Sequence, residues 1–532
     1  MKYSVFFLVF LYLSLFASPL SETLGDPGST NPFSARMSGN GPASVYFNPA
    51  LLSLEEKQFS FNTFYTYQNL RISYGERPED ADITGNRENL TGIYGAKTSE
   101  YPDRDIPFKP LPTDKLYKER GSFDNTADNF YASMGFVFPV IKNHLSFGVY
   151  ALLPMGKLQE QSTFFVDERE QYFSNSLHFE LYEDRMTSQT ISAALSGGWK
   201  WIYFGAGLSV VTNAQVNAEI FTQDTSTKMD VSTESEFGTS VIPHFGLQIT
   251  PWKSLFLTAT LHLPSKSKIN SENNISFWGG SEGLEAMENT EVNIVYGYKP
   301  LTFSIGTGFS DMKISSDMKI SAGVSAEFRN WSDYRNRYSK RPENNVYWDW
   351  TKTSVAGDYE KQGDWISQTV DKYRWKNTWS IITGTSFSWK KFKVGLDFAY
   401  VPSPVPDQDG RTNYVDNDKF NLGTGVSYEF PLYGDFNLSA GVGFQAQIFS
   451  ERSVKKTNID SETGTSFGKD GALIDEFPDS ECDDFCGVSN NDLDAGDEIS
   501  ESRGVQSNNP GYGGFTSRGV IYTAGIWLKL LF

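Results

Sequence analysis

The last fourteen residues of the chain, Gly519 to Phe532, restrict its fold more than any other stretch. Successive side chains of a β-strand point to opposite faces. Here one face is apolar at every position and ends on the C-terminal aromatic: Val520, Tyr522, Ala524, Ile526, Leu528, Leu530 and Phe532. The other face is more mixed. A soluble domain seldom ends on such a strand, because an exposed apolar edge invites aggregation. A β-barrel closes that edge, and a barrel in lipid requires this pattern.

The first residues have the features of an export signal. Lys2 is followed by an apolar run from Val5 to Phe16 and then by Ala17-Ser18-Pro19. This run is too short to span a bilayer as a mature helix, so we expect a signal peptide over residues 1–21, cleaved between Ala17 and Glu22. The alternative is a single N-terminal anchor helix. No cysteine lies near the cleavage region, which excludes a lipoprotein anchor.

Composition narrows the class of protein further. Mean hydropathy is -0.40, and no other run approaches the length of a spanning helix, so a membrane protein of this sequence has to be a barrel. Aromatic residues make up 15% of the chain, which suits the two interface girdles of such a barrel. A net charge of -19 argues against a nucleic-acid partner, since phosphates require a basic face.

Alternating segments of about ten residues recur along the chain. In one of them, Phe436, Leu438 and Ala440 face away from Asn437, Ser439 and Gly441. A β-sandwich also alternates, but the signal peptide, the final Phe532 and the strand lengths favour a membrane barrel. We expect fourteen strands, near residues 58–74, 128–140, 144–154, 186–199, 201–221, 236–250, 253–263, 297–309, 317–330, 379–389, 391–401, 419–430, 436–449 and 519–532.

The connections are alternately short and long, which is the outer-membrane pattern and places both termini on the periplasmic side. Short turns are expected at Val140 to Asn143, Pro251 to Lys253, Asp311 to Asp317 and Pro431 to Asp435. Long external loops are expected at 75–127, 156–185, 264–296, 331–378 and 450–518.

The segment 22–57 precedes the barrel, which we expect to cover 58–532. It is rich in Gly, Pro, Ser and Asn, but it also contains Val45, Tyr46 and Phe47, which favour burial. A disordered tail has a similar composition. The apolar residues favour the other interpretation, a plug, or hatch, that folds in the lumen of the barrel.

Several motifs, in order along most of the mature chain, together resemble the FadL family of outer-membrane transporters of long-chain fatty acids and other hydrophobic compounds. They are Ser44-Val-Tyr-Phe-Asn48-Pro49-Ala50-Leu51, Gly148-Val-Tyr-Ala-Leu-Leu-Pro154-Met-Gly156, Gly205-Ala-Gly-Leu208, Pro243-His-Phe-Gly246, Asn330-Trp331-Ser332 and Ser403-Pro404-Val405-Pro406-Asp407. No single motif is specific, but the set is. The segment ahead of Asn48 is shorter than is usual in that family, and three of the loops look long.

The resemblance implies a mechanism in which the plug gates a gap in the barrel wall. Asn48, Pro49 and Ala50 would form the plug end of this gate, and Gly148, Pro154 and Gly156 would permit a kink in the third strand. A kink exposes backbone groups that must find partners, and ligand would leave sideways through the gap. The plain alternative is a buried turn next to an ordinary strand end.

Two further sets of residues are candidates for ligand binding. Phe277 and Trp278 form an aromatic cluster that suits a greasy groove, although girdle or loop packing explains them equally well. Lys319 and Arg329 are among six charges expected in the lumen that are able to hold a carboxylate head; the others are Glu327, Lys393, Asp397 and Glu429. Such charges more often pair with one another and line water.

The insertion 450–518 contains the remaining candidate sites. Asp492, Asp494 and Asp497 offer oxygen ligands at a spacing that suits Ca²⁺, but they lack an EF-hand pattern, and acid-rich loops are usually solvated. Cys482 and Cys486 are the only cysteines, and their spacing permits a small external disulfide.

These observations predict an all-β fold: a 14-stranded antiparallel transmembrane β-barrel with an N-terminal plug in the lumen. The expected function is passive uptake of long-chain fatty acids or hydrocarbons across a bacterial outer membrane, with no cofactor and no enzymatic activity. The alternatives are a FadL-like surface scaffold that binds protein partners and a general polar porin. The expected partners are the hydrophobic ligand, outer-membrane lipid and lipopolysaccharide, and the barrel assembly machinery through Phe532, with the chain acting as a monomer.

Overall fold

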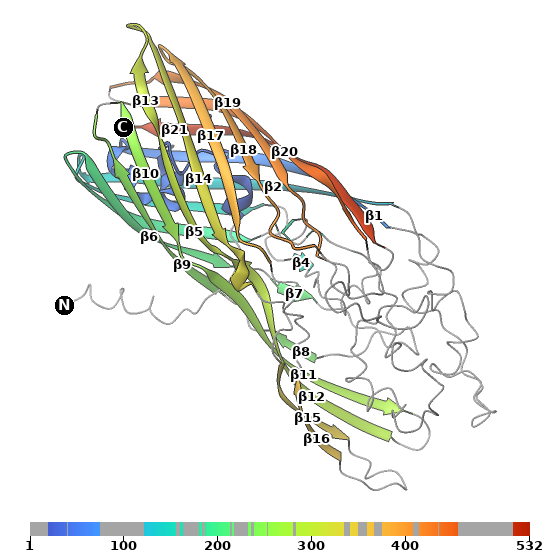
Figure 1. The fold of residues 1–532 in the computed structure, drawn as a ribbon. Helices are drawn as coiled ribbons and strands as arrows, with labels where there is room; N and C mark the ends of the chain where they lie inside the picture. Colours follow the sequence, from blue (N-terminus) through green and yellow to red (C-terminus); the bar gives the residue numbers. More distant parts are fainter. Residues whose placement is uncertain are drawn as a thin grey trace, which may run out of the picture.

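The computed structural model describes residues 20–39, 41–74, 122–155, 160–162, 179, 181–182, 186, 188–212, 215–217, 232–235, 239–252, 254–279, 284–334, 341–348, 359–365, 375–407, 414–434, 436–455 and 514–532. Fourteen strands form one closed antiparallel barrel (Figure 1). In barrel order they are β1 (Gln58–Tyr74), β2 (Ser122–Ile141), β3 (Leu145–Pro154), β5 (Gln189–Trp199), β6 (Ile202–Thr212), β9 (Thr239–Ile249), β10 (Leu255–His262), β13 (Leu301–Lys313), β14 (Met318–Asn330), β17 (Thr378–Trp389), β18 (Phe392–Val401), β19 (Lys419–Pro431), β20 (Asn437–Val454) and β21 (Phe515–Leu531).

All fourteen predicted strands are therefore confirmed, and each pairs with its neighbour in sequence order. The first and last strands close the barrel, with Gln58 opposite Leu531 and Tyr74 opposite Phe515. The predicted ends of the strands are less accurate. β2 begins six residues before its predicted start, and β6 ends at Thr212 instead of near residue 221.

The predicted loops 264–296 and 331–378 are only partly loops. They contain β11 (Ser265–Gly279), β12 (Leu284–Lys299), β15 (Arg341–Trp348) and β16 (Tyr359–Trp365). With β8 (Ser232–Ser235) these form a second, five-stranded sheet in the order β16-β15-β12-β11-β8, and Figure 1 shows it beyond the long-loop end of the barrel. β4 (Glu160–Ser162) and β7 (Gln215–Asn217) pair separately. Strands outside lipid need no continuous apolar face, so the barrel pattern does not detect them.

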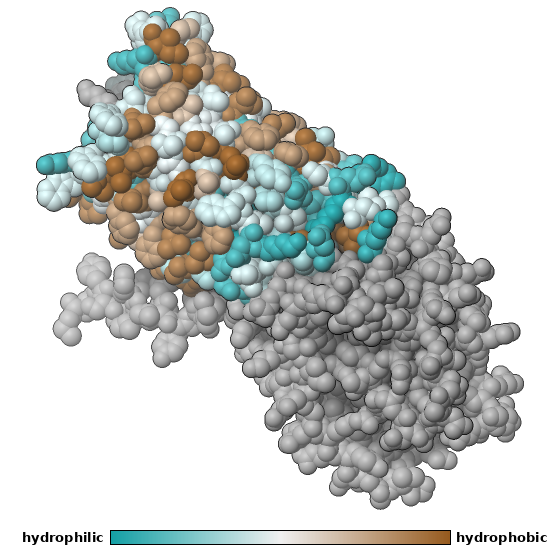
Figure 2. Space-filling view, viewed as in Figure 1, coloured by the Kyte–Doolittle hydropathy of each residue, from teal (hydrophilic) through white to brown (hydrophobic). Residues whose placement is uncertain are grey.

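The outward face of the barrel is apolar, as the alternation predicts. On β21, Tyr522, Ile526 and Leu528 are 41%, 60% and 48% exposed, whereas Ile521 and Thr523 are buried on the lumen side. Figure 2 shows apolar residues over the barrel wall, with a polar band where the wall meets the long-loop side. Within the described residues no helix is long and apolar enough to cross a membrane.

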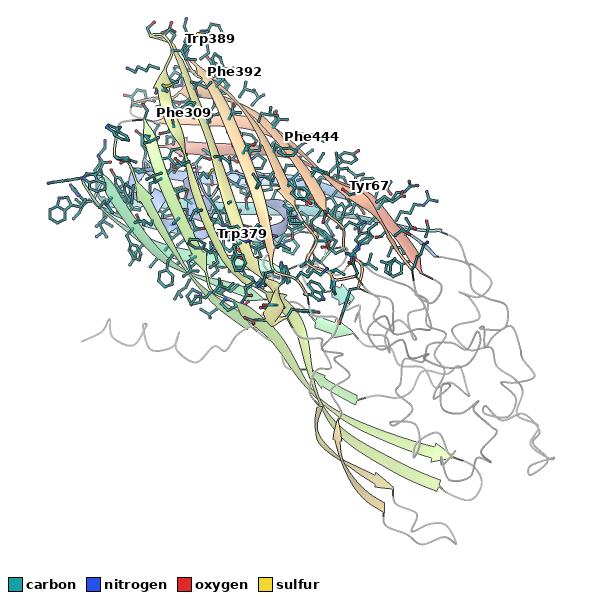
Figure 3. All side chains as sticks on the ribbon, viewed as in Figure 1. Tyr67, Phe309, Trp379, Trp389, Phe392 and Phe444 are labelled. Carbon is teal, nitrogen blue, oxygen red and sulfur yellow. The ribbon has the colours of Figure 1, made fainter. Side chains whose placement is uncertain are left out.

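Exposed tryptophans mark both ends of this apolar wall. Trp379 and Trp389 are 54% and 49% exposed and lie at opposite ends of β17 (Figure 3). Ten residue steps span roughly 33 Å along a strand, or about 25 Å of height when the strand is tilted by about 40°. That height matches the apolar band of an outer-membrane barrel.

The N-terminal segment lies inside the barrel, against the inward faces of the strands (Figure 1). It consists of short helical turns, namely α1 (Ser21–Leu24), η2 (Gly41–Ala43), α2 (Ser44–Phe47) and η3 (Pro49–Leu54). A further turn, η6 (Trp331–Asp333), follows β14. Val45, Tyr46 and Leu52 are buried in the main apolar cluster of the barrel.

On the inner face of the wall, a large side chain is accommodated by small residues of the neighbouring strand. The inward indole of Trp527 lies across Gly441 and Gly443, and a Cβ atom at Gly441 would overlap its ring. The final residue packs on the outside, where the Phe532 ring stacks on Phe436 at 5.7 Å and the Phe532 N–H donates to the Lys57 carbonyl.

We expect Gly441→Ala to destabilise the barrel by about 1–3 kcal/mol, because the added methyl overpacks the site against Trp527. Folded fraction against urea, read by heat-modifiable migration on gels, checks this. Gly197→Ala is the matched control, since its Cβ would have only the His144 carbonyl oxygen nearby, at 3.9 Å. Equal stability of the two variants would contradict this account of Trp527.

Candidate functional site

A cavity lies between the N-terminal segment and the barrel wall, in the half nearer the long loops. The space between the atoms there amounts to about 850 Å³, part of which is open solvent. Its apolar lining comes from Phe33, Phe47, Leu181, Trp331, Ile382, Ala399 and Val401, and its charged lining comes from Glu22, Arg36, Lys299, Glu327, Arg329 and Lys419. A cavity with apolar walls and a few converging polar groups is the usual form of a small-molecule site.

The charged side of the cavity is a chain of ion pairs between the N-terminal segment and β14. Arg36 Nη2 lies 2.8 Å from Glu22 Oε1, and Arg36 Nη1 lies 2.8 Å from Glu327 Oε2. The other oxygen of Glu327 lies 2.7 Å from Arg329 Nη2. Glu327 is fully buried, so each of its oxygens needs a cationic partner. These contacts fix the position of the N-terminal segment in the lumen.

Lys299 adds a positive charge that this network does not neutralise. It is 1% exposed, and its Nζ atom lies 3.5 Å from Glu22 Oε1 without a hydrogen bond that meets geometric criteria. The Tyr46 hydroxyl also donates to Glu22. Glu22 and Glu327 thus face three cations, Arg36, Lys299 and Arg329, which leaves one positive charge in excess beside the cavity. Such an excess attracts a monoanion.

The protonation state of the Glu22 carboxyl group follows from these neighbours. Burial alone raises the pKa of its carboxyl group, but Arg36 and Lys299 together hold that pKa well below its usual range. Glu22 is therefore ionised in this position and draws Lys299 and Arg36 to one point of the lumen.

A second cation lies across the cavity. Lys419 Nζ is 3.2 Å from Asp416 Oδ1 and 4.9 Å from the centroid of the Tyr182 ring. Since Asp416 is fully buried and neutralises it, Lys419 adds no charge in excess. This side of the cavity is polar but balanced.

Asn48 holds the N-terminal segment to the wall at β10. Its Nδ2 donates to the Arg36 carbonyl at 3.0 Å and to Thr258 Oγ1 at 2.8 Å, while its Oδ1 accepts from the Ala50 N–H and caps η3. Pro49 and Ala50 lie against Gly205 and Gly246, where a Cβ would overlap them. The resemblance implied that Asn48 would bind the wall at the third strand. Its hydrogen bond to the wall instead runs to β10, four strands along the barrel.

The third strand shows no irregularity at Gly148. β3 pairs with β5 without a register shift from Leu145 to Leu152. A Cβ at Gly148 would lie 2.6 Å from Val45 Cγ2, so this glycine admits the N-terminal segment. Pairing with β2 continues to Pro154, two residues beyond the last pair with β5. Gly156 lies outside the described residues.

The other predicted site residues are dispersed. Arg329 lines the cavity, whereas Lys319 is 47% exposed at the short-turn end of β14, far along the strand. Phe277 and Trp278 lie on β11 in the second sheet. Cys482, Cys486, Asp492, Asp494 and Asp497 lie outside the described residues, and among those described no three His, Cys, Asp or Glu side chains form a metal site.

Sequence reasoning missed Glu22, Arg36 and Lys299. A usable signal existed, because Glu22, Asp26 and Arg36 are the only charged residues between positions 22 and 54. Lys299 is the last residue of β12, directly before Pro300, and the sequence placed it in the predicted strand 297–309 without assigning it a role.

Asp397 is the other anchor of the N-terminal segment. Its Oδ2 accepts from the Phe33 and Ser34 N–H groups at 2.8 and 3.0 Å, and its Oδ1 accepts from Asn31 Nδ2 at 2.7 Å and from Ser34 Oγ. A headgroup role for Asp397, considered from the sequence, is inconsistent with these contacts, because they saturate the carboxylate.

Asp397→Ala should loosen residues 31–34, since two buried N–H groups lose their acceptor at a cost of about 1–3 kcal/mol each. Hydrogen exchange of that peptide is expected to quicken, while exchange in the barrel strands stays unchanged. Asp311→Ala, whose side chain is 69% exposed, is the control. Unchanged exchange at residues 31–34 would show that Asp397 does not hold the segment.

No profile of a known protein family matches the sequence, and no curated protein matches it. Solved structures do match. A FadL homologue of Pseudomonas aeruginosa aligns over 97% of this chain and 98% of its own length, at 13% identity and a TM-score of 0.48. The toluene transporter TodX of P. putida aligns over 95% and 99%, at 9% identity and a TM-score of 0.40. The toluene transporter TbuX of Ralstonia pickettii aligns over 98% and 100%, at 12% identity and a TM-score of 0.37. The first of these is described as a homologue of FadL, the family that the sequence motifs of this chain resemble.

Proposed function

We propose that this chain is an outer-membrane transporter of the FadL type that takes up hydrophobic compounds passively. The observation that carries the proposal is the lumenal cavity, which joins apolar walls to one buried positive charge in excess. A wet porin would have an open polar lumen, whereas here residues 20–57 occupy it. The matched FadL homologue and toluene transporters support the same class of substrate.

Among hydrophobic compounds, a long-chain carboxylate fits the cavity better than a neutral hydrocarbon. Its tail would contact Phe33, Ile382 and Val401, and its head would face Lys299 and Arg329. Removing each CH₂ from water contributes about 0.8 kcal/mol, so a long chain enters without an energy source. A neutral ligand would leave the positive charge without a counterion.

We further propose that the ligand leaves sideways between β3 and β5. The two strands pair only as far as Leu152 and Thr190, whereas β3 stays paired with β2 to Pro154. Pairing along β3 therefore ends two residues earlier with β5 than with β2, near the cavity end of the N-terminal segment, where Leu20 N–H donates to Ser188 Oγ.

In this proposal Pro154 lies at the gap itself. Gly148 and the Asn48-Pro49-Ala50 turn act farther along the same strands, where they hold the N-terminal segment against the wall, with Ser196 Oγ of β5 donating to the Ala50 carbonyl.

A surface scaffold is the second candidate, and the five-stranded sheet β16-β15-β12-β11-β8 favours it, because transport through a barrel does not require such a sheet. Uptake of radiolabelled oleate by cells with and without the gene separates the two. A scaffold gives equal uptake in both.

Lys299→Met should weaken binding of oleate about tenfold, a loss of about 1.4 kcal/mol, and leave binding of the uncharged oleyl alcohol unchanged. Tryptophan fluorescence titration of the purified barrel measures both affinities. Lys376→Met, whose side chain is 62% exposed, is the matched control. If the alcohol loses as much affinity as the acid, Lys299 supports the cavity without reading the headgroup.

Locking the β3–β5 seam should stop uptake. In a background with Cys482 and Cys486 replaced by serine, a Leu153→Cys, Gln189→Cys pair continues the observed register by one step and forms a disulfide across the seam. Oleate uptake is expected to fall to about a tenth and to recover on reduction, since a covalent bond prevents the gap from opening.

The control pair is Ala132→Cys with Leu153→Cys, which are partners across the seam between β2 and β3. This crosslink should leave uptake intact. Full uptake through the crosslinked β3–β5 seam would exclude this exit.

A further inference from the structure

The short-turn end of the barrel is basic, although the chain as a whole carries a net charge of -19. Among its described residues, six lysines are exposed against three carboxylates, Glu56, Asp311 and Asp317. The lysines are Lys142, Lys200, Lys313, Lys319, Lys390 and Lys391. The acidic surplus lies elsewhere, as in the stretch between Lys469 and Arg503, which contains no basic residue. Charge is therefore distributed unequally along the barrel axis.

The same turns expose large apolar side chains. Trp199 and Trp201 flank Lys200 and are 73% and 49% exposed, and Trp389, at 49%, precedes Lys390. Lys200 Nζ lies 5.8 Å from the Trp199 ring, and Lys390 Nζ lies 5.6 Å from the Trp389 ring. Tryptophan exposed to this degree is favourable where its ring meets lipid and its N–H meets water.

Turn geometry does not account for the lysines. Lys200 and Lys390 adopt φ angles of 58° and 53°, a left-handed conformation that glycine or asparagine adopts at lower cost. Among the described residues neither lysine forms an ion pair with a carboxylate, and the Lys319–Asp311 contact is long, at 4.0 Å. The ammonium groups thus point outward from rigid turns without a strong partner in the described part of the chain.

We infer that this ring of lysines and tryptophans, at Lys142, Lys200, Trp199, Trp389, Lys390 and Lys391, binds anionic phospholipid headgroups of the leaflet around the short-turn end. The tryptophans lie at the boundary of headgroups and acyl chains, and the ammonium groups meet the phosphates. The inference rests on the barrel spanning a membrane and not on which compound it carries. Its consequence is a barrel held at a defined depth and surrounded by selected lipid.

Native mass spectrometry of the purified full-length barrel tests this. The detergent micelles contain equal amounts of phosphatidylglycerol and phosphatidylcholine with the same acyl chains. The wild type should retain phosphatidylglycerol roughly fivefold over phosphatidylcholine, and raising the salt to about 0.5 M should reduce this preference, because exposed charges are screened. The triple variant Lys142→Gln, Lys200→Gln, Lys390→Gln should lose the preference.

The matched control removes three exposed cations from the opposite end, with Lys376→Gln, Lys455→Gln and Arg518→Gln, so that both variants have the same net charge. It should keep the wild-type preference, and heat-modifiable migration verifies that every variant is folded. No preference in the wild type, an undiminished preference in the ring variant, or an equal loss in the control would each overturn the inference.

Discussion

Closure of the barrel is the constraint on which the rest of the structure depends. β1 pairs with β21 along its full length, from Gln58 opposite Leu531 to Tyr74 opposite Phe515, so that no strand edge remains. In a lipid environment each unpaired backbone group costs several kcal/mol, and only a closed ladder removes them all. The outward apolar side chains, such as Ile526 and Leu528, are tolerable because of this closure. The inward polar side chains are tolerable because the lumen is separated from lipid.

Filling the lumen creates the second problem, because the inner wall offers polar groups that need partners. Asp397 and Glu327 of the wall bind the N-terminal segment, and Asn48 of that segment binds Thr258 of β10, at different points around the barrel. Glycines such as Gly148 and Gly205 let the segment approach the wall. The segment is consequently held by directional contacts as well as by buried apolar side chains such as Val45, Tyr46 and Leu52. The segment also leaves a cavity beside Lys299, and this cavity is where we place the ligand.

The cavity and the lysine ring are independent consequences of one architecture. A barrel has two ends and two faces, and the chain uses all four differently: long loops and a second sheet at one end, rigid turns at the other, lipid outside and the charged cavity inside. The excess positive charge of the cavity lies in the lumen, where the low local dielectric strengthens its attraction to an anion. The positive charges of the turns are exposed, and they act only collectively and only on a surface of opposite charge.

By itself the sequence determined the class of fold, the number of strands and their order. Alternation is a local property, since the residues of each strand alone show which of its two faces is apolar. The short turns between strands can also be recognised directly in the sequence. Arg329 was recognised as a lumenal charge for the same reason, and the Asn48-Pro49-Ala50 turn was recognised by its motif. The five-stranded sheet was missed because strands outside lipid carry no continuous apolar face. Only the tertiary structure decided that Glu22, Arg36, Lys299 and Glu327 meet, because they come from three distant parts of the chain. Their meeting depends on how the N-terminal segment threads the lumen, and a charge in the sequence does not specify its partner.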